Sequence, residues 1–142
     1  LRVSRHLLIQ LAELGLPIAT EVLSPAAANY LEDTLSWAAI GARTTESQTH
    51  RELVSGLDMP VGFKNGTDGE LGAALDAIQA ASRPHSHFGM SATGEAALVA
   101  TNGNPDTHLI IRGGRAGPNY DTNSVAVAAK ALRTAGICGR VG

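Results

Sequence analysis

Apolar residues recur along this chain at a helical spacing in five segments. A spacing of three or four residues is typical of a helix with one buried face. Capping-box spacing predicts two of the helix starts, at Thr45 with Gln48 and at Thr67 with Glu70, and Ser4 can cap the first helix. Glycine and proline follow several of these segments and predict where the helices end. We expect helices over residues 1–14, 26–36, 45–56, 67–78 and 123–135.

Short apolar runs between these segments predict strands. The main runs cover residues 17–23, 37–43, 59–63, 85–90 and 109–112, and an extra strand over 96–101 returns after a turn at 92–94. The main strands recur every 20 to 26 residues or so, each followed by a helix, which is typical of a parallel sheet. A five-stranded doubly wound sheet would be complete at this length. A (β/α)8 barrel needs about 250 residues, so the chain would hold about five of its eight units. The rhythm alone leaves both architectures open.

Composition narrows the class of protein. The chain has 142 residues, enough for one domain, with 44% hydrophobic and 17% charged residues, so a packed core is expected. A net charge of −2 argues against nucleic acid or an anionic membrane as a partner, so any anion site must be a local gathering of cations. No apolar run approaches the roughly 18 residues of a membrane span. The single cysteine, Cys138, has no internal disulfide partner, and a cytoplasmic setting is expected.

Charged side chains stand at the carboxyl ends of four predicted strands. Glu21 ends the first strand, Arg43 the second, Lys64 the third and Arg112 the last. In parallel α/β folds the carboxyl ends of the strands share one edge, where ligands bind. Arginine contacts carboxylate or phosphate with two donors, and lysine adds a point charge. The sequence therefore predicts a site for a small molecule that carries both phosphate and carboxylate groups.

The histidines are less informative than these cations. His85 and His87 lie two apart in a predicted strand, hence on one face. A pair of histidines needs further ligands to hold a metal ion. We expect packing or hydrogen bonding at these two positions.

Two long segments carry a resemblance to a known family. "GARTTESQTHRELVSGLDMPVGFKNGTDG" at 41–69 and "HLIIRGGRAGPNYD" at 108–121 strongly resemble the type I 3-deoxy-D-arabino-heptulosonate 7-phosphate (DAHP) synthases, the first enzymes of the shikimate pathway. The family has longer chains built on a (β/α)8 barrel. The resemblance implies that residues 1–142 are a single partial domain, an internal fragment holding the third to seventh barrel strands.

The resemblance also implies roles for individual residues. Arg43, Lys64 and Arg112 match the family's phosphoenolpyruvate-binding cations, and Ala42 matches the position whose backbone N–H reaches the phosphate. Glu21 matches the acid of the family's "GEF" segment, which here reads "TEV", and the resemblance implies that it too belongs to the phosphoenolpyruvate site. The family's metal ligands, a Cys, a His, a Glu and an Asp, lie outside the matched stretch, so a divalent metal ion is expected in the full protein and none in this chain.

The resemblance implies that the full protein condenses phosphoenolpyruvate with D-erythrose 4-phosphate to DAHP and phosphate. The isolated chain is expected to be inactive. The family's aromatic amino acid feedback site uses the region "HSHFGMSATGEAAL" and the loop near 26–29, and a lysine is usual where Ser91 and Ala92 stand here. The full protein is expected to be a homo-oligomer. The alternative is a complete five-stranded α/β module that senses a phosphorylated metabolite without catalysis.

Overall fold

The main sheet is parallel, and its strands follow the order of the chain. The structure is a computed structural model that describes residues 1–91 and 93–142. Within these residues the sheet order is β1-β2-β3-β6, with each pair parallel. Its strands are β1 (Ala19–Glu21), β2 (Trp37–Ile40), β3 (Val61–Lys64) and β6 (Thr107–Ile110). Chain-order pairing of parallel strands is the arrangement of part of a (β/α)8 barrel and excludes the doubly wound alternative.

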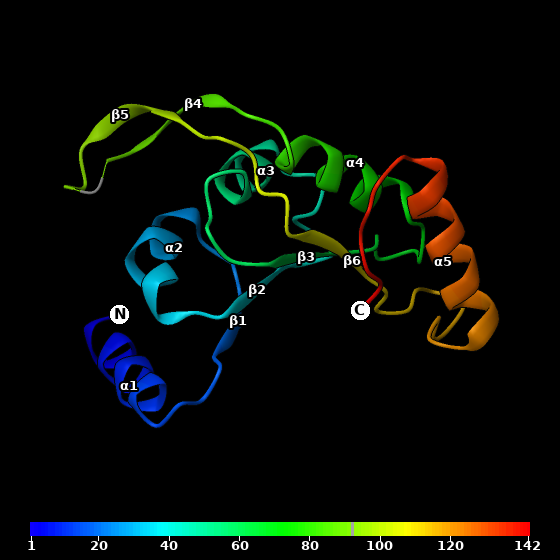
Figure 1. Ribbon diagram of the computed structural model, residues 1–142, viewed down its shortest axis with the longest axis horizontal. Coiled ribbons are helices and arrows are strands. Elements are labelled where there is room, and N and C mark those ends of the chain that lie inside the picture. Colours follow the sequence, from blue (N-terminus) through cyan, green and yellow to red (C-terminus); the bar gives the residue numbers. More distant parts are fainter. Residues whose placement is uncertain (92) are drawn as a thin grey trace.

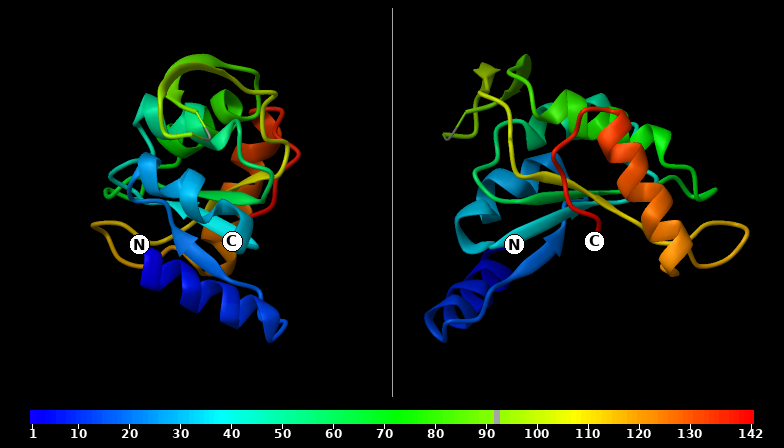
Figure 2. Two further views of the ribbon diagram at one scale, coloured as in Figure 1. Left: turned by 90° about the vertical axis from the view of Figure 1, so that its left-hand side faces the viewer. Right: turned by 45° about the vertical axis from the view of Figure 1, so that its right-hand side comes forward.

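Helices pack on one face of this sheet and close the core. Figure 1 shows α3 (Gln48–Val54) and α4 (Gly72–Ala81) over the same face, with α5 (Thr122–Thr134) at the β6 side. Figure 2 shows α1 (Arg2–Glu13) beside the β1 edge, and α2 (Pro25–Leu31) with the 3-10 helix η1 (Glu32–Thr34) completes the order. Every second residue of the central strands is fully buried beneath these helices, and the main core residues are Ala38, Ile40, Val61, Phe63, Leu109, Val54, Ala74, Ala77, Ile78, Ala128 and Leu132.

The prediction that residues 85–90 form a strand of the parallel sheet is wrong. Its residues form β4 (Ser86–Met90), which pairs antiparallel with β5 (Ala96–Ala100) in a hairpin separate from the main sheet. The hairpin projects from the body in both figures. The extra strand at 96–101 is therefore confirmed as the partner of the 85–90 strand. The described residues hold four named strands in the parallel sheet, and Val141 makes an isolated parallel bridge to Leu109 of β6. The five-stranded module, which needs 85–90 in the sheet, therefore fails, and the numbering of the strands as the third to seventh of a barrel stays a prediction. Ala92, within the predicted turn, lies outside the described residues.

The three predicted helix caps are also wrong, because the helices begin at other residues. Helix α3 begins after Ser47, whose hydroxyl oxygen accepts from the backbone N–H of His50 at 3.4 Å. Helix α4 begins after Leu71 and α1 after Leu1, both without a side-chain cap. Asp121 caps α5 by accepting from two backbone N–H groups. The Ser124 hydroxyl, its strongest partner, and those N–H groups hold the pKa of Asp121 below its usual value.

The sheet face turned away from α3 and α4 is crowded near β3 and β6. A Cβ on Gly62 would lie 2.3 Å from Cδ1 of Ile110 and 2.8 Å from Nε2 of His108. The Trp37 indole N–H donates to the same His108 nitrogen at 3.0 Å. Glycine at position 62 thus lets side chains from the next strand cover this face, on which Lys64 also lies.

Among the residues described, no helix is long and apolar enough to cross a membrane.

Candidate anion site at the carboxyl edge of the sheet

Strand register brings the four predicted residues to one edge, which we call the carboxyl edge. Ile40 pairs with Phe63, and Lys64 pairs with Ile110, so the ends of β2, β3 and β6 are level. Arg43 and Arg112 follow these ends in the next turns of chain, and Glu21 is the last residue of β1. The predicted placement on neighbouring parallel strands is confirmed. The roles of these residues in binding stay predictions.

Glu21 and Lys64 are in direct contact across the edge. The Lys64 ammonium donates to Oε2 of Glu21 at 2.6 Å, and both side chains are partly exposed. The other carboxylate oxygen covers Gly41 closely enough that a Cβ there would meet it at 2.4 Å. The Glu21 carboxylate therefore reaches past the end of β2 to the end of β3. An exposed pair of this kind contributes about 1 kcal/mol or less to stability, so its clearest consequence is to orient the lysine.

Arg43 and Ala42 lie in the tight turn that links β2 to α3. Backbone N–H groups of Thr44 and Thr45 both donate to Gly41 O at 2.9 Å, which closes this turn immediately after the strand. The Arg43 side chain is exposed, and Ala42 is half-buried. A turn this compact fixes the arginine backbone relative to the strand end while leaving its guanidinium accessible to a ligand.

Arg112 is held at the end of β6 through its backbone. Its N–H donates to Oδ1 of Asn65 at 2.8 Å, and Asn65 directly follows Lys64 in the chain. Gly113 adopts a φ of 82°, a left-handed conformation that favours glycine. Gly114 packs against the loop of Asp68 and Gly69, where a Cβ would lie 2.3 Å from Asp68 O. The "RGG" segment is thus a close backbone contact between the β3 and β6 loops.

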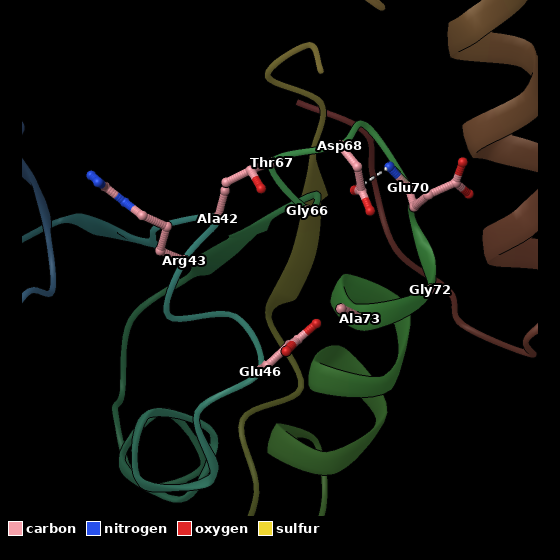
Figure 3. Close-up of a pocket in the computed structure, with 9 residues that line it drawn as sticks. All are labelled: Ala42, Arg43, Glu46, Gly66, Thr67, Asp68, Glu70, Gly72 and Ala73. Carbon is pink, nitrogen blue, oxygen red and sulfur yellow. Dashed lines mark hydrogen bonds between the residues drawn. The ribbon is translucent and has the colours of Figure 1, made fainter. Parts of the chain in front are cut away.

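A cavity of about 400 Å³ opens beside this edge, but its lining does not suit an anion. Besides Arg43 it presents the carboxylates of Glu46, Asp68 and Glu70. In Figure 3 the Arg43 side chain extends away from Asp68 and Glu70. Three carboxylates would repel a phosphate group more strongly than one arginine on the rim attracts it. The acidic lining therefore makes this cavity a poor candidate for an anion site.

Two side chains at the carboxyl edge make structural hydrogen bonds that sequence reasoning missed. The capping-box spacing predicts Thr45 as a helix cap and nothing in the sequence pattern singles out Asn65, yet both are fully buried. Both make hydrogen bonds to main-chain groups of neighbouring strand ends. A polar residue directly after a buried strand is a weak signal, and the partners lie too far along the chain to be read from spacing.

The described residues do not fit a metal centre. Across residues 1–91 and 93–142, no group of three or more His, Cys, Asp and Glu side chains is placed to hold a metal ion. Cys138 is exposed. His85 instead donates its Nε2–H to Ala80 O at 2.8 Å, which confirms the hydrogen bonding predicted for it.

Comparison with known proteins gives one family. The family model described as "DAHP synthetase I family" matches residues 4–138 of the chain. The Tyr-sensitive phospho-2-dehydro-3-deoxyheptonate aldolase of Escherichia coli is 56% identical over 137 residues, covering 96% of this chain and 38% of that protein. The Phe-sensitive protein of the same species is 51% identical over 141 residues, covering 99% of this chain and 40% of that protein. This chain therefore spans about two fifths of the length of these relatives.

A solved structure has the same fold over nearly the whole chain. The phospho-2-dehydro-3-deoxyheptonate aldolase of Francisella tularensis superposes with a TM-score of 0.95 and 44% sequence identity. The match covers 99% of this chain and 41% of that structure. The parallel sheet and the projecting hairpin are thus the arrangement of a corresponding portion of a larger fold.

Proposed function

This chain belongs to the DAHP synthetase I family, and we propose that it supplies the phosphoenolpyruvate-binding part of a DAHP synthase. In that reaction the third carbon of phosphoenolpyruvate forms a bond to the aldehyde carbon of erythrose 4-phosphate. Water adds to the second carbon of phosphoenolpyruvate, and phosphate leaves. Residues 1–142 would form one partial domain, a middle portion of the (β/α)8 barrel, within a longer protein that we call the whole protein.

The observation that carries this proposal is the placement of three cations at level strand ends. Phosphoenolpyruvate carries a phosphate and a carboxylate, which together need several positive groups at short range. Lys64 ends β3, and Arg43 and Arg112 follow the ends of its neighbours β2 and β6. We assign the two arginines to two-pronged contacts with the anionic groups, because a guanidinium matches their geometry. The backbone N–H of Ala42 adds a neutral donor for the phosphate.

Glu21 would act on the lysine rather than on the anion. Its carboxylate contacts the Lys64 ammonium at 2.6 Å and would repel a phosphate placed against it. We propose that it sets the direction of the ammonium. Together the cations hold phosphoenolpyruvate so that its third carbon faces the aldehyde, and they stabilise charge on the departing phosphate.

Other parts of the assignment come from family membership. We propose that the whole protein uses a divalent metal ion held by residues outside this chain, and no step above uses a metal held here. Relatives carry the names Tyr-sensitive and Phe-sensitive. We propose that an aromatic amino acid likewise inhibits the whole protein, that it is a homo-oligomer, and that it works in the cytoplasm.

Turnover by the whole protein tests this function. With phosphoenolpyruvate, erythrose 4-phosphate and a divalent metal ion, we expect DAHP and phosphate to form in equal amounts. Omitting erythrose 4-phosphate should abolish phosphate release, which controls for a simple phosphatase. Phosphate release that does not depend on the aldehyde, or no consumption of phosphoenolpyruvate under any metal condition, would rule the synthase out.

A further inference from the structure

Two fully buried polar side chains tie together the three loops that carry the cations. Thr45 and Asn65 are both 0% exposed, yet each stands immediately beside the solvent-facing carboxyl edge. Burying a polar side chain costs free energy unless it is hydrogen-bonded. The partners of these two side chains therefore show what each of them holds in place.

Thr45 links the Arg43 turn to the end of β3. Its hydroxyl shares one hydrogen between Lys64 O, at 2.8 Å, and Gly41 O, at 3.1 Å. Gly41 O also closes the turn that contains Arg43. The backbone oxygen of Thr45 accepts from Nε of Arg51 at 2.9 Å, which anchors the same residue to α3. One hydroxyl thus fixes the separation between the backbones of Arg43 and Lys64.

Asn65 links the end of β3 to the loop after β6. Its amide nitrogen donates one hydrogen to Gly113 O at 3.0 Å and the other to Gly66 O at 2.7 Å. Its amide oxygen accepts from the backbone N–H of Arg112 at 2.8 Å. Asn119 reinforces this link by accepting from the Gly113 N–H at 2.7 Å. The Asn65 side chain therefore hydrogen-bonds to the main chain just before and just after the Arg112 carbonyl, at the Arg112 N–H and at Gly113 O.

We propose that Thr45 and Asn65 are positioning residues that hold Arg43, Lys64 and Arg112 at the spacing phosphoenolpyruvate requires. Neither side chain is exposed to a ligand, so both act through the backbones that carry the cations. A strand end is where ladder hydrogen bonds stop, and loops that follow it spread unless other groups join them. The inference rests on the proposed function, because it concerns the site for that substrate.

The chain offers matched controls at the opposite edge of the same sheet. Asn104 is 2% exposed, and its amide donates to Met59 O, near the amino end of β3, at 2.9 Å. Thr107 is 5% exposed and begins β6. Changing these two residues removes buried hydrogen-bonding groups of the same kinds without touching the carboxyl edge. A general loss of stability will therefore appear both in these control variants and in variants of Thr45 and Asn65. A change in the spacing of the cations will appear in the variants of Thr45 and Asn65 alone.

The test compares substrate affinities in variants of the whole protein. Thr45→Val keeps the side-chain shape without the hydroxyl, and Asn65→Leu removes the amide without adding charge. We expect each to weaken phosphoenolpyruvate binding by about tenfold to a hundredfold, the range that misplacement of a binding group by about 1 Å produces. The KM for erythrose 4-phosphate should change far less. Thr45→Ser, which keeps the hydroxyl, should restore binding, and Thr107→Val and Asn104→Leu should leave it within about threefold of the parent protein.

Three results would overturn the inference. The first is that Thr45→Val binds phosphoenolpyruvate as tightly as the parent does, and this variant decides the matter alone if Asn65→Leu does not fold. The second is that the control variants weaken phosphoenolpyruvate binding as much as the edge variants do. The third is that the affinities for both substrates fall together. If the parent binds phosphoenolpyruvate and any of these results is obtained, the positioning role is wrong while the function stands. If the parent does not bind it, both are wrong.

Discussion

Replacing Arg43 with alanine in the whole protein is expected to weaken phosphoenolpyruvate binding by about 30-fold to several thousand-fold. Truncating one member of a buried ion pair costs about 2 to 5 kcal/mol, because its charged partner is left without a counterion. The turn closed by Gly41 O holds the Arg43 backbone at the end of β2. Titration of phosphoenolpyruvate into the parent and variant proteins measures the effect.

Two further arginine variants separate a ligand contact from a general charge effect. Arg43→Lys should recover only part of the affinity, because one ammonium does not reproduce a two-pronged contact. Arg83 is exposed and lies near Thr107, at the amino end of β6, so Arg83→Ala removes the same charge from the opposite edge. It should leave affinity unchanged. If Arg43→Ala binds within about threefold of the parent, a change of about 0.65 kcal/mol, Arg43 is a solvated surface charge.

The isolated 142-residue chain is expected to have no synthase activity. The chain spans 38% of the length of the Tyr-sensitive relative, so most of that fold lies outside it. Strand β1 stands at an edge of the parallel sheet, and the hairpin exposes Phe88 and Leu98, which are 81% and 73% exposed. Open strand edges and exposed apolar side chains favour aggregation. Assay of the purified chain with both substrates and a divalent metal ion measures this.

The whole protein assayed in parallel is the positive control for that experiment. Light scattering of the isolated chain shows whether it stays monomeric during the assay. DAHP formation above background by the monomeric chain would contradict the expectation. It would mean that the carboxyl edge alone completes the site for both substrates.

The strands that carry the site were predictable because they are buried. A parallel strand covered on both faces is a continuous apolar run, and "WAAI" and "LII" are such runs. Their carboxyl ends share an edge once the strands are parallel, so the placement of Arg43, Lys64 and Arg112 followed. The antiparallel pairing of Ser86–Met90 was not predictable in this way. Its residues alternate between exposed and half-buried in the structure, but the exposed positions include Phe88 and Met90, so the sequence lacks the polar face that is typical of a half-solvated antiparallel strand.

The buried hydrogen bonds of the site were not predictable from the sequence. Thr45 has the local spacing of a capping box, but its hydroxyl bonds to Lys64 O, 19 residues away. Asn65 bonds to Gly113 O, 48 residues away. Local spacing predicts only local partners, whereas these partners exist because the sheet brings three strand ends together. Such residues become recognisable only when their burial is known.

A structure of the whole protein with bound phosphoenolpyruvate tests the central claim most directly. We expect the phosphate and carboxylate oxygens to lie within about 3.2 Å of side-chain nitrogens of Arg43, Lys64 and Arg112, the usual limit for such hydrogen bonds. The Ala42 N–H should point to the phosphate, and Thr45 and Asn65 should keep their main-chain partners. Phosphoenolpyruvate bound elsewhere, with Arg43 and Arg112 both facing solvent, would contradict the account.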